Sequence, residues 1–155
     1  MVGAFCVDIK GSTSENEMEA VMIKKVNVYG LAGFFFFAGC YHFINPGFYY
    51  PLIPPYLPFP TAINSLSGVL EVVLGVALLI PRFRFYSAIG LMILLVLFIP
   101  SHIYFIQIGG CADQGLCVPL WVAWVRLVVI HPLLIGWVWA SRGRSRKTFT
   151  TPVGE

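Results

Sequence analysis

The chain has 155 residues, of which 58% are hydrophobic, 15% aromatic and only 11% charged. A soluble domain usually carries about 25% charged residues, so this composition, with a mean hydropathy of +0.82, indicates an integral membrane protein instead. The basic residues behind the net charge of +3 are few and flank apolar segments, which argues against a nucleic-acid-binding protein.

Residues 1–21 are polar and weakly acidic, and they lack the cationic start and the apolar stretch of a signal peptide. The run Gly11-Ser12-Thr13-Ser14 disfavours a helix, so we expect a disordered N-terminal tail. Met22-Ile23-Lys24-Lys25 directly precedes the first apolar run and has the form of a native start. One hypothesis is therefore that residues 1–21 extend the native protein, which peptide mapping of the native N-terminus would test.

Four apolar runs follow, at residues 26–45, 62–80, 84–107 and 118–140. Each approaches or exceeds the ~20 residues that a helix needs to cross a bilayer. Buried helices of soluble proteins rarely reach such lengths without a charged face. The sequence therefore predicts an all-α polytopic membrane protein, with a four-transmembrane-helix bundle at residues 22–141 and a basic tail at residues 142–155.

The basic residues predict the orientation of this bundle. They precede the first run, separate the second from the third, and follow the fourth: Lys24, Lys25, Arg82, Arg84, Arg142, Arg144, Arg146 and Lys147. The other two connections, at residues 46–61 and 108–117, carry a single charge, Asp113. The positive-inside rule then predicts a multi-pass protein of the cell (inner) membrane with both termini in the cytoplasm. The two weakly charged connections would face the periplasm or the outside.

The connection at residues 46–61 contains six prolines, which prevent a regular helix through most of it. It is also apolar and rich in tyrosine. One interpretation is a lid over the mouth of the bundle, with Tyr49 and Tyr56 as the covering residues. The alternative is a rigid connector at the membrane interface, where tyrosine-rich segments are common.

Two cysteines, Cys111 and Cys117, bracket five residues of the second outer connection. An oxidising compartment favours a disulfide there, and Gly115 eases the hairpin that the bond requires. The pair could be a structural cross-link or a redox-active site. The Cys-x-x-Cys spacing of thiol oxidoreductases is absent, which favours the cross-link.

Polar and small residues recur at helical spacing along the second run: Asn64, Ser67, Glu71 and Gly75. At ~100° per residue they lie on one face of a helix, and that face is expected to point into the bundle. Ionisable residues inside a membrane are costly, so Glu71 is expected to have a partner. Arg126 in the fourth run lies ~12 Å below the outer end and Glu71 ~15 Å, at 1.5 Å per residue. Matching depths predict a Glu71–Arg126 ion pair, either as a polar lock between helices or as part of a functional site.

Three histidines extend this candidate site. His42 and His102 lie near the outer ends of the first and third runs, and His131 lies deeper in the fourth. Arg126 and His131 are five residues apart, ~140° on a helix, so they are not expected to point the same way. The His-x-x-x-His spacing of a helical metal pair is absent, so we predict no metal site on one helix. Haem held by histidines from two helices is the cofactor hypothesis that ranks after a quinone.

Several short motifs occur together in order: His42-Phe43-x-x-Pro46-x-x-Tyr49, Ile53-Pro54-Pro55-Tyr56-Leu57-Pro58, Ser67-Gly68-x-x-Glu71-x-x-x-Gly75, Leu78-Leu79-x-Pro81, Pro100-x-x-Ile103-Tyr104 and Trp124-x-Arg126-Leu127. Over about residues 27–140 this set resembles the DoxX-like family of small four-span membrane proteins. Related sequences often have Asn in place of His102, and Pro-Leu-Gln in place of Val128-Val129-Ile130. His131 could replace that glutamine. The resemblance implies a four-helix membrane bundle, and some members look like quinone-linked subunits while others look like assembly chaperones.

The chain contains no phosphate loop, nucleophile elbow, zinc signature or dinucleotide fingerprint, so whether it is an enzyme stays open. The first functional hypothesis is a quinone-linked or redox-associated accessory subunit, in which His42, His102 or Glu71 exchanges protons with the ring. The alternative is a non-catalytic binding or assembly protein that holds a lipid, a small amphiphile or a partner helix. A small transporter is the third. Expected partners are the lipid bilayer and other membrane or redox subunits.

Overall fold

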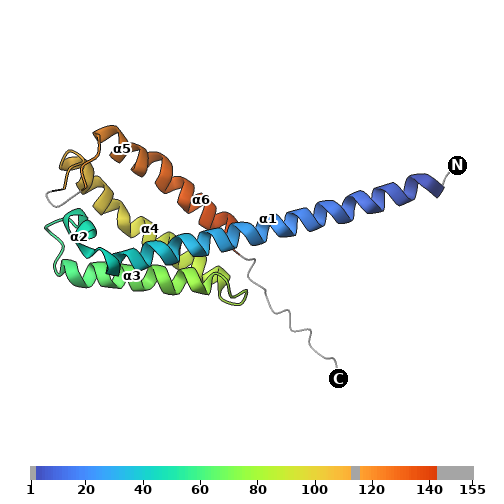
Figure 1. Ribbon diagram of the computed structural model, residues 1–155, viewed down its shortest axis with the longest axis horizontal. Helices are drawn as coiled ribbons and strands as arrows, with labels where there is room; N and C mark the ends of the chain where they lie inside the picture. Colours follow the sequence, from blue (N-terminus) through green and yellow to red (C-terminus); the bar gives the residue numbers. More distant parts are fainter. Residues whose placement is uncertain (1–2, 113–115, 143–155) are drawn as a thin grey trace, which may run out of the picture.

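The computed structural model describes residues 3–112 and 116–142. These ranges are helical, with one isolated β-bridge and no strand. The helices are α1 (Gly3–Ile44), α2 (Pro46–Tyr49), the 3₁₀ turn η1 (Tyr50–Leu52), α3 (Pro60–Ala77), α4 (Arg84–Gln107), α5 (Leu120–Val125), the π turn η2 (Arg126–Ile130) and α6 (His131–Ser141). The all-α four-helix bundle predicted from the sequence is confirmed (Figure 1).

Four helical stretches are long and apolar enough to cross a membrane: Val21–Ile44 within α1, Pro60–Ala77, Arg84–Gln107 and Leu120–Ser141. The last of these stretches consists of α5, η2 and α6, which follow one another without a break. The bundle has two distinct ends. We call the one with Lys24, Arg82 and Arg142 the basic end, and the one with α2 and η1 the loop end (Figure 1).

Helix α1 begins at Gly3, so it includes most of the segment that we expected to be a disordered tail. This part projects beyond the basic end of the bundle (Figure 1). Continuing an existing helix needs no new nucleus, and Glu, Met and Ala between residues 15 and 20 have high helix propensity. Apart from Arg142, the predicted basic tail at residues 142–155 lies outside the described residues.

Glycines bring α1 and α3 into close contact. A Cβ atom built on Gly39 would lie 2.7 Å from the carbonyl oxygen of Gly68, and one on Gly68 would lie 2.7 Å from the Cβ of His42. A Cβ on Gly75 would lie 3.2 Å from the Ala32 carbonyl oxygen. Small residues let helix backbones approach closely in membranes, and here they place His42 beside the polar face of α3.

Two apolar clusters hold the bundle, one toward each end. The larger one, toward the basic end, joins all four spans through eight buried residues: Leu31, Ala32, Phe35, Leu78, Ala88, Leu91, Leu95 and Val138. The smaller one, at the loop end, consists of Leu52, Phe105, Ala112 and Ala123. Five buried polar residues of the spans lie in the space between these clusters: His42, Asn64, Ser67, Glu71 and His131.

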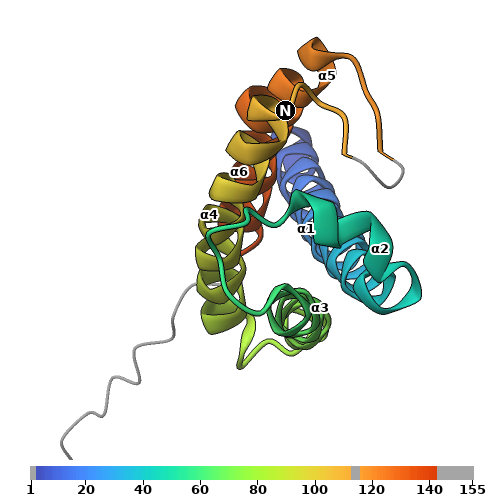
Figure 2. The same cartoon turned by 90° about the vertical axis from the view of Figure 1, so that its left-hand side faces the viewer.

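The proline-rich connection folds across the loop end. Figure 2 shows the chain leaving α2, passing toward α4 and returning to α3. Leu52 and Pro54 are buried. Phe59 adopts a left-handed conformation, φ 59°, just before the helix begins at Pro60; a residue before proline avoids the right-handed helical region.

The connection between α4 and α5 is a narrow hairpin closed by a Cys111–Cys117 disulfide. Gly109 and Gly110 both have positive φ, near +78°, which residues with a side chain rarely adopt. Leu116 and Val118 pack against the cluster around Leu52. The hairpin therefore packs onto the loop end of the bundle, which is consistent with a structural cross-link. Residues 113–115 lie outside the described residues.

Candidate functional site

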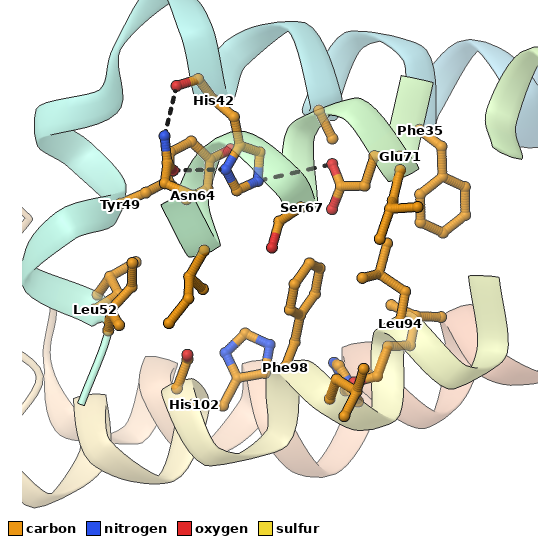
Figure 3. Close-up of a pocket in the computed structure, with 18 of the residues that line it drawn as sticks. Phe35, His42, Tyr49, Leu52, Asn64, Ser67, Glu71, Leu94, Phe98 and His102 are labelled. Atoms are coloured by element: carbon orange, nitrogen blue, oxygen red, sulfur yellow. Dashed lines mark hydrogen bonds and ion pairs between the residues drawn. The ribbon is translucent and has the colours of Figure 1, made fainter. Parts of the chain in front are cut away.

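A cavity of about 410 Å³ lies between the two apolar clusters (Figure 3). It is bounded by α1, α3, α4, the η2–α6 segment and the residues after α2. Seven residues predicted for an intramembrane polar site all line it: His42, Asn64, Ser67, Glu71, His102, Arg126 and His131. The structure thus brings residues from all four spans to one internal space.

His42 is held by two hydrogen bonds to Asn64. The Asn64 amide donates from Nδ2 to the His42 carbonyl oxygen at 2.9 Å, and its Oδ1 lies 2.7 Å from His42 Nδ1. Because the first bond fixes the amide orientation, Oδ1 accepts a hydrogen bond from the Nδ1–H group of His42. The other ring nitrogen, Nε2, does not contact Asn64 and lies 3.8 Å from Glu71 Oε2. Asn64 is therefore a positioning residue for His42.

Glu71 is buried with its Oε2 atom 3.8 Å from His42 Nε2, and this oxygen has no hydrogen-bond partner. The structure does not form the predicted Glu71–Arg126 ion pair; the basic group within salt-bridge distance of Glu71 is His42. The prediction matched the depths of the two charges but not their directions. The glycine contacts set α1 against α3, whereas α5 and η2 pack against α4.

Arg126 and His131 line the same cavity, so the expectation that they point apart is wrong. The reason is the π turn: the His131 backbone N–H donates to the Arg126 carbonyl oxygen, five residues earlier. A turn with this i→i+5 bond winds less per residue than an α-helix, so residues five apart lie closer to the same face. Pro132 has no N–H and its ring crowds the preceding turn, which explains why the regular helix is interrupted here.

His102 and His131 meet edge to face across α4 and α6. The ring centroids of His102 and His131 are 4.8 Å apart, and His131 Nε2 donates to the Leu95 carbonyl oxygen at 2.8 Å. This bond leaves His131 Nε2 unable to ligate, which fits poorly with haem held between these histidines. Among the described residues no group of three or more His, Cys, Asp or Glu could hold a metal ion.

Tyr49 lies in the cavity wall, with its ring stacked on His42 at a centroid distance of 3.6 Å. Burial raises the pKa of Tyr49 to about 12, with a further increase from Glu71 and a smaller opposing effect of Arg126. The phenol therefore stays neutral and can donate a hydrogen bond at any physiological pH. Tyr56, the other predicted lid residue, is 71% exposed and does not line the cavity.

No sequence pattern indicated the apolar part of the cavity wall, which includes Phe35, Leu52, Phe98 and Phe105. Every span is apolar on most of its surface, so no pattern separates residues facing the cavity from residues facing lipid. Figure 3 shows His42, Asn64 and Glu71 on one side of this space, and His102 and Phe98 on the other.

Replacing Asn64 with alanine is expected to lower the free energy of unfolding by about 1–3 kcal/mol, because the buried His42 carbonyl and Nδ1 groups would lose their partner. Thermal unfolding of purified protein in detergent measures the effect. Asn45→Ala is the matched control. The Asn45 side chain is exposed and donates a hydrogen bond to the Tyr41 hydroxyl, so its loss should cost no more than about 0.5 kcal/mol. Equal effects of the two substitutions would show that Asn64 does not hold His42.

With its four apolar membrane-spanning helices around an internal polar site, the chain is a multi-pass membrane protein. It belongs to the family described as Domain of unknown function (DUF8561), which matches residues 31–142 and so includes every polar residue of the cavity. No curated protein and no solved structure matches the chain.

Proposed function

We propose that this protein binds the headgroup of a lipid-soluble quinone in the cavity, as an accessory subunit of a membrane redox system. The observation that carries the proposal is the arrangement of polar groups in a mostly apolar space. His42 and Glu71 lie on one side of the cavity and His102 on the other (Figure 3). A quinone ring has an apolar body and one carbonyl oxygen at each end, so it matches a site with hydrogen-bonding groups on two opposite sides.

The residues on the two sides have distinct roles in this proposal. Reduction of the ring to a quinol takes two electrons, from a partner redox protein, and two protons, one at each oxygen. His42, held as an imidazolium beside the Glu71 carboxylate, would give one proton from Nε2, the nitrogen that Asn64 leaves free. His102 would supply the proton for the other quinone oxygen. The neutral Tyr49 hydroxyl also lines the cavity and can donate a hydrogen bond there.

The resemblance to DoxX-like proteins, some of which look like quinone-linked subunits, supports the same ligand class. The proposed setting is the cell inner membrane, with the basic end and both termini in the cytoplasm. Lys24 and Arg142 line one surface hollow at that end, which agrees with a single cytoplasmic side under the positive-inside rule.

A non-catalytic binding or assembly role is the second candidate, and one observation favours it. Arg126 is half-buried in the cavity wall, and within the described ranges no carboxylate lies within salt-bridge distance of it. A guanidinium in that position could bind the anionic headgroup of a lipid or another small amphiphile.

The experiment is extraction of the unaltered protein into lipid nanodiscs, followed by native mass spectrometry of what remains bound. We expect a quinone enriched over its share of the bulk lipid, and added decylubiquinone should displace it. An enriched anionic lipid without quinone would support the second candidate and overturn the first. Neither ligand bound above background would overturn both.

A further inference from the structure

Packed apolar side chains lie at both ends of the cavity. Toward the basic end, Leu31, Leu78 and Val138 belong to the large apolar cluster. At the loop end, Leu52 and Phe105 pack together beneath the proline-rich connection. A ligand coming from the water on either side of the membrane would have to separate one of these clusters.

The side of the cavity between α3 and α4 is different. Leu66 on α3 and Leu97 on α4 both line the cavity, yet they are 61% and 65% exposed. Residues that line a cavity and also present outer surface mark an opening. α3 and α4 are joined by a short turn and pack at the basic end, where Gly90 contacts Leu74, so the opening lies farther along the pair. Both helices are membrane spans, so this opening faces lipid.

We propose that the ligand enters and leaves the cavity sideways, from the bilayer, between α3 and α4, and that its apolar tail stays in this opening. The proposal rests on the proposed function and narrows the ligand to an amphiphile with a long apolar chain. Ile63, Leu66 and Leu70 on α3, with Leu94 and Leu97 on α4, give such a chain an aliphatic path from the polar site to lipid. A water-soluble solute gains nothing from that path.

A second possible route lies between α1 and η2, where Phe34 and Ile130 also line the cavity and are partly exposed. The route between α3 and α4 is favoured because its lining residues are more exposed and extend over more of both helices. Substitutions on each side distinguish the two.

The test measures the exchange rate of decylubiquinone in nanodiscs. Leu97→Trp should slow the binding of decylubiquinone by about tenfold, because a bulky side chain in an entry path raises the barrier to entry. Ile93→Trp is the matched control: it lies one turn away on α4, is 56% exposed, does not line the cavity, and should leave the rates unchanged. Leu66→Trp gives the same closure from α3 if Leu97→Trp does not fold.

Three results would overturn the route. Slowing by Phe34→Trp but not by Leu97→Trp would place entry between α1 and η2. Unchanged rates in all of these variants, with binding intact, would exclude a side entry and leave the proposed function standing. Failure of the unaltered protein to bind decylubiquinone would overturn the quinone site itself, and the route with it.

Discussion

Replacing Gly39 with alanine is expected to destabilise the protein by about 1–3 kcal/mol, the usual cost of overpacking a close contact. The new Cβ would lie 2.7 Å from the Gly68 carbonyl oxygen and 2.9 Å from the Cβ of Glu71. Backbone atoms cannot move aside as a flexible side chain can, so α1 and α3 must separate. That separation would also move His42 away from Asn64 and Glu71. The melting temperature in detergent measures the loss.

Gly33→Ala provides the control for this prediction on the same helix. A Cβ on Gly33 would meet nothing within 4 Å, and alanine has a helix propensity about 1 kcal/mol better than that of glycine. We therefore expect Gly33→Ala to leave the melting temperature unchanged or slightly raised. If Gly39→Ala behaves the same way, the close packing of α1 on α3 is incorrect.

Replacing Glu71 with glutamine is expected to weaken quinone binding at least tenfold with little loss of stability. The substitution keeps the size of the side chain but removes the negative charge that favours protonated His42. The hydrogen bond from a charged His42 to the quinone oxygen would contribute about 1.5–3 kcal/mol, which is lost when His42 is neutral. The folded bundle should remain within about 1 kcal/mol of the unaltered protein, because Glu71 Oε2 makes no hydrogen bond that would be lost. Decylubiquinone titration and thermal unfolding measure the two quantities separately.

Two outcomes would contradict this expectation. If Glu71→Gln melts far below the unaltered protein, Glu71 serves as a structural lock. If it binds decylubiquinone as tightly as the unaltered protein does, the carboxylate takes no part in the site. Glu19→Gln, a change of the same chemistry at an exposed position of α1, shows what the loss of one charge does by itself.

The spans were predictable because composition alone determines which segments can lie in lipid. The polar face of α3 was predictable for a related reason: Asn64, Ser67 and Glu71 recur at the helical period, and all are buried. These properties are local to one helix. They depend on the chain within a few turns and not on its neighbours.

The partners of those residues were not predictable in the same way. Depth along a span follows from counting residues, but the direction of a side chain around the helix axis depends on which helices touch. Gly39, Gly68 and Gly75 carried that information, since glycines on two spans allow a close approach. Read together, they would have indicated α1 as the neighbour of α3 and His42 as the partner of Glu71.

The π turn could have been suspected from Pro132, although its position could not be assigned. A proline removes one hydrogen bond from a helix, and the helix can respond by kinking, by ending or by taking up an extra residue in one turn. Pro100 in α4 leaves a continuous helix, whereas Pro132 follows a π turn. Sequence rules do not distinguish these responses, because tertiary contacts decide between them.

The π turn η2 changes how the length of the fourth span is linked to the rotation of α6 relative to α5. A π turn accommodates one residue more than an α-helical turn at nearly the same place along the axis. Deleting one residue from η2 would therefore restore a regular α-helical turn, with little change in the length of the span or in the rotation of α6 relative to α5. His131 and Val138 would keep their places in the cavity and the core. A one-residue deletion within α5 or α6 would instead rotate the residues beyond it by ~100°. We therefore expect the fourth span to tolerate a one-residue deletion in η2 better than one in α5 or α6.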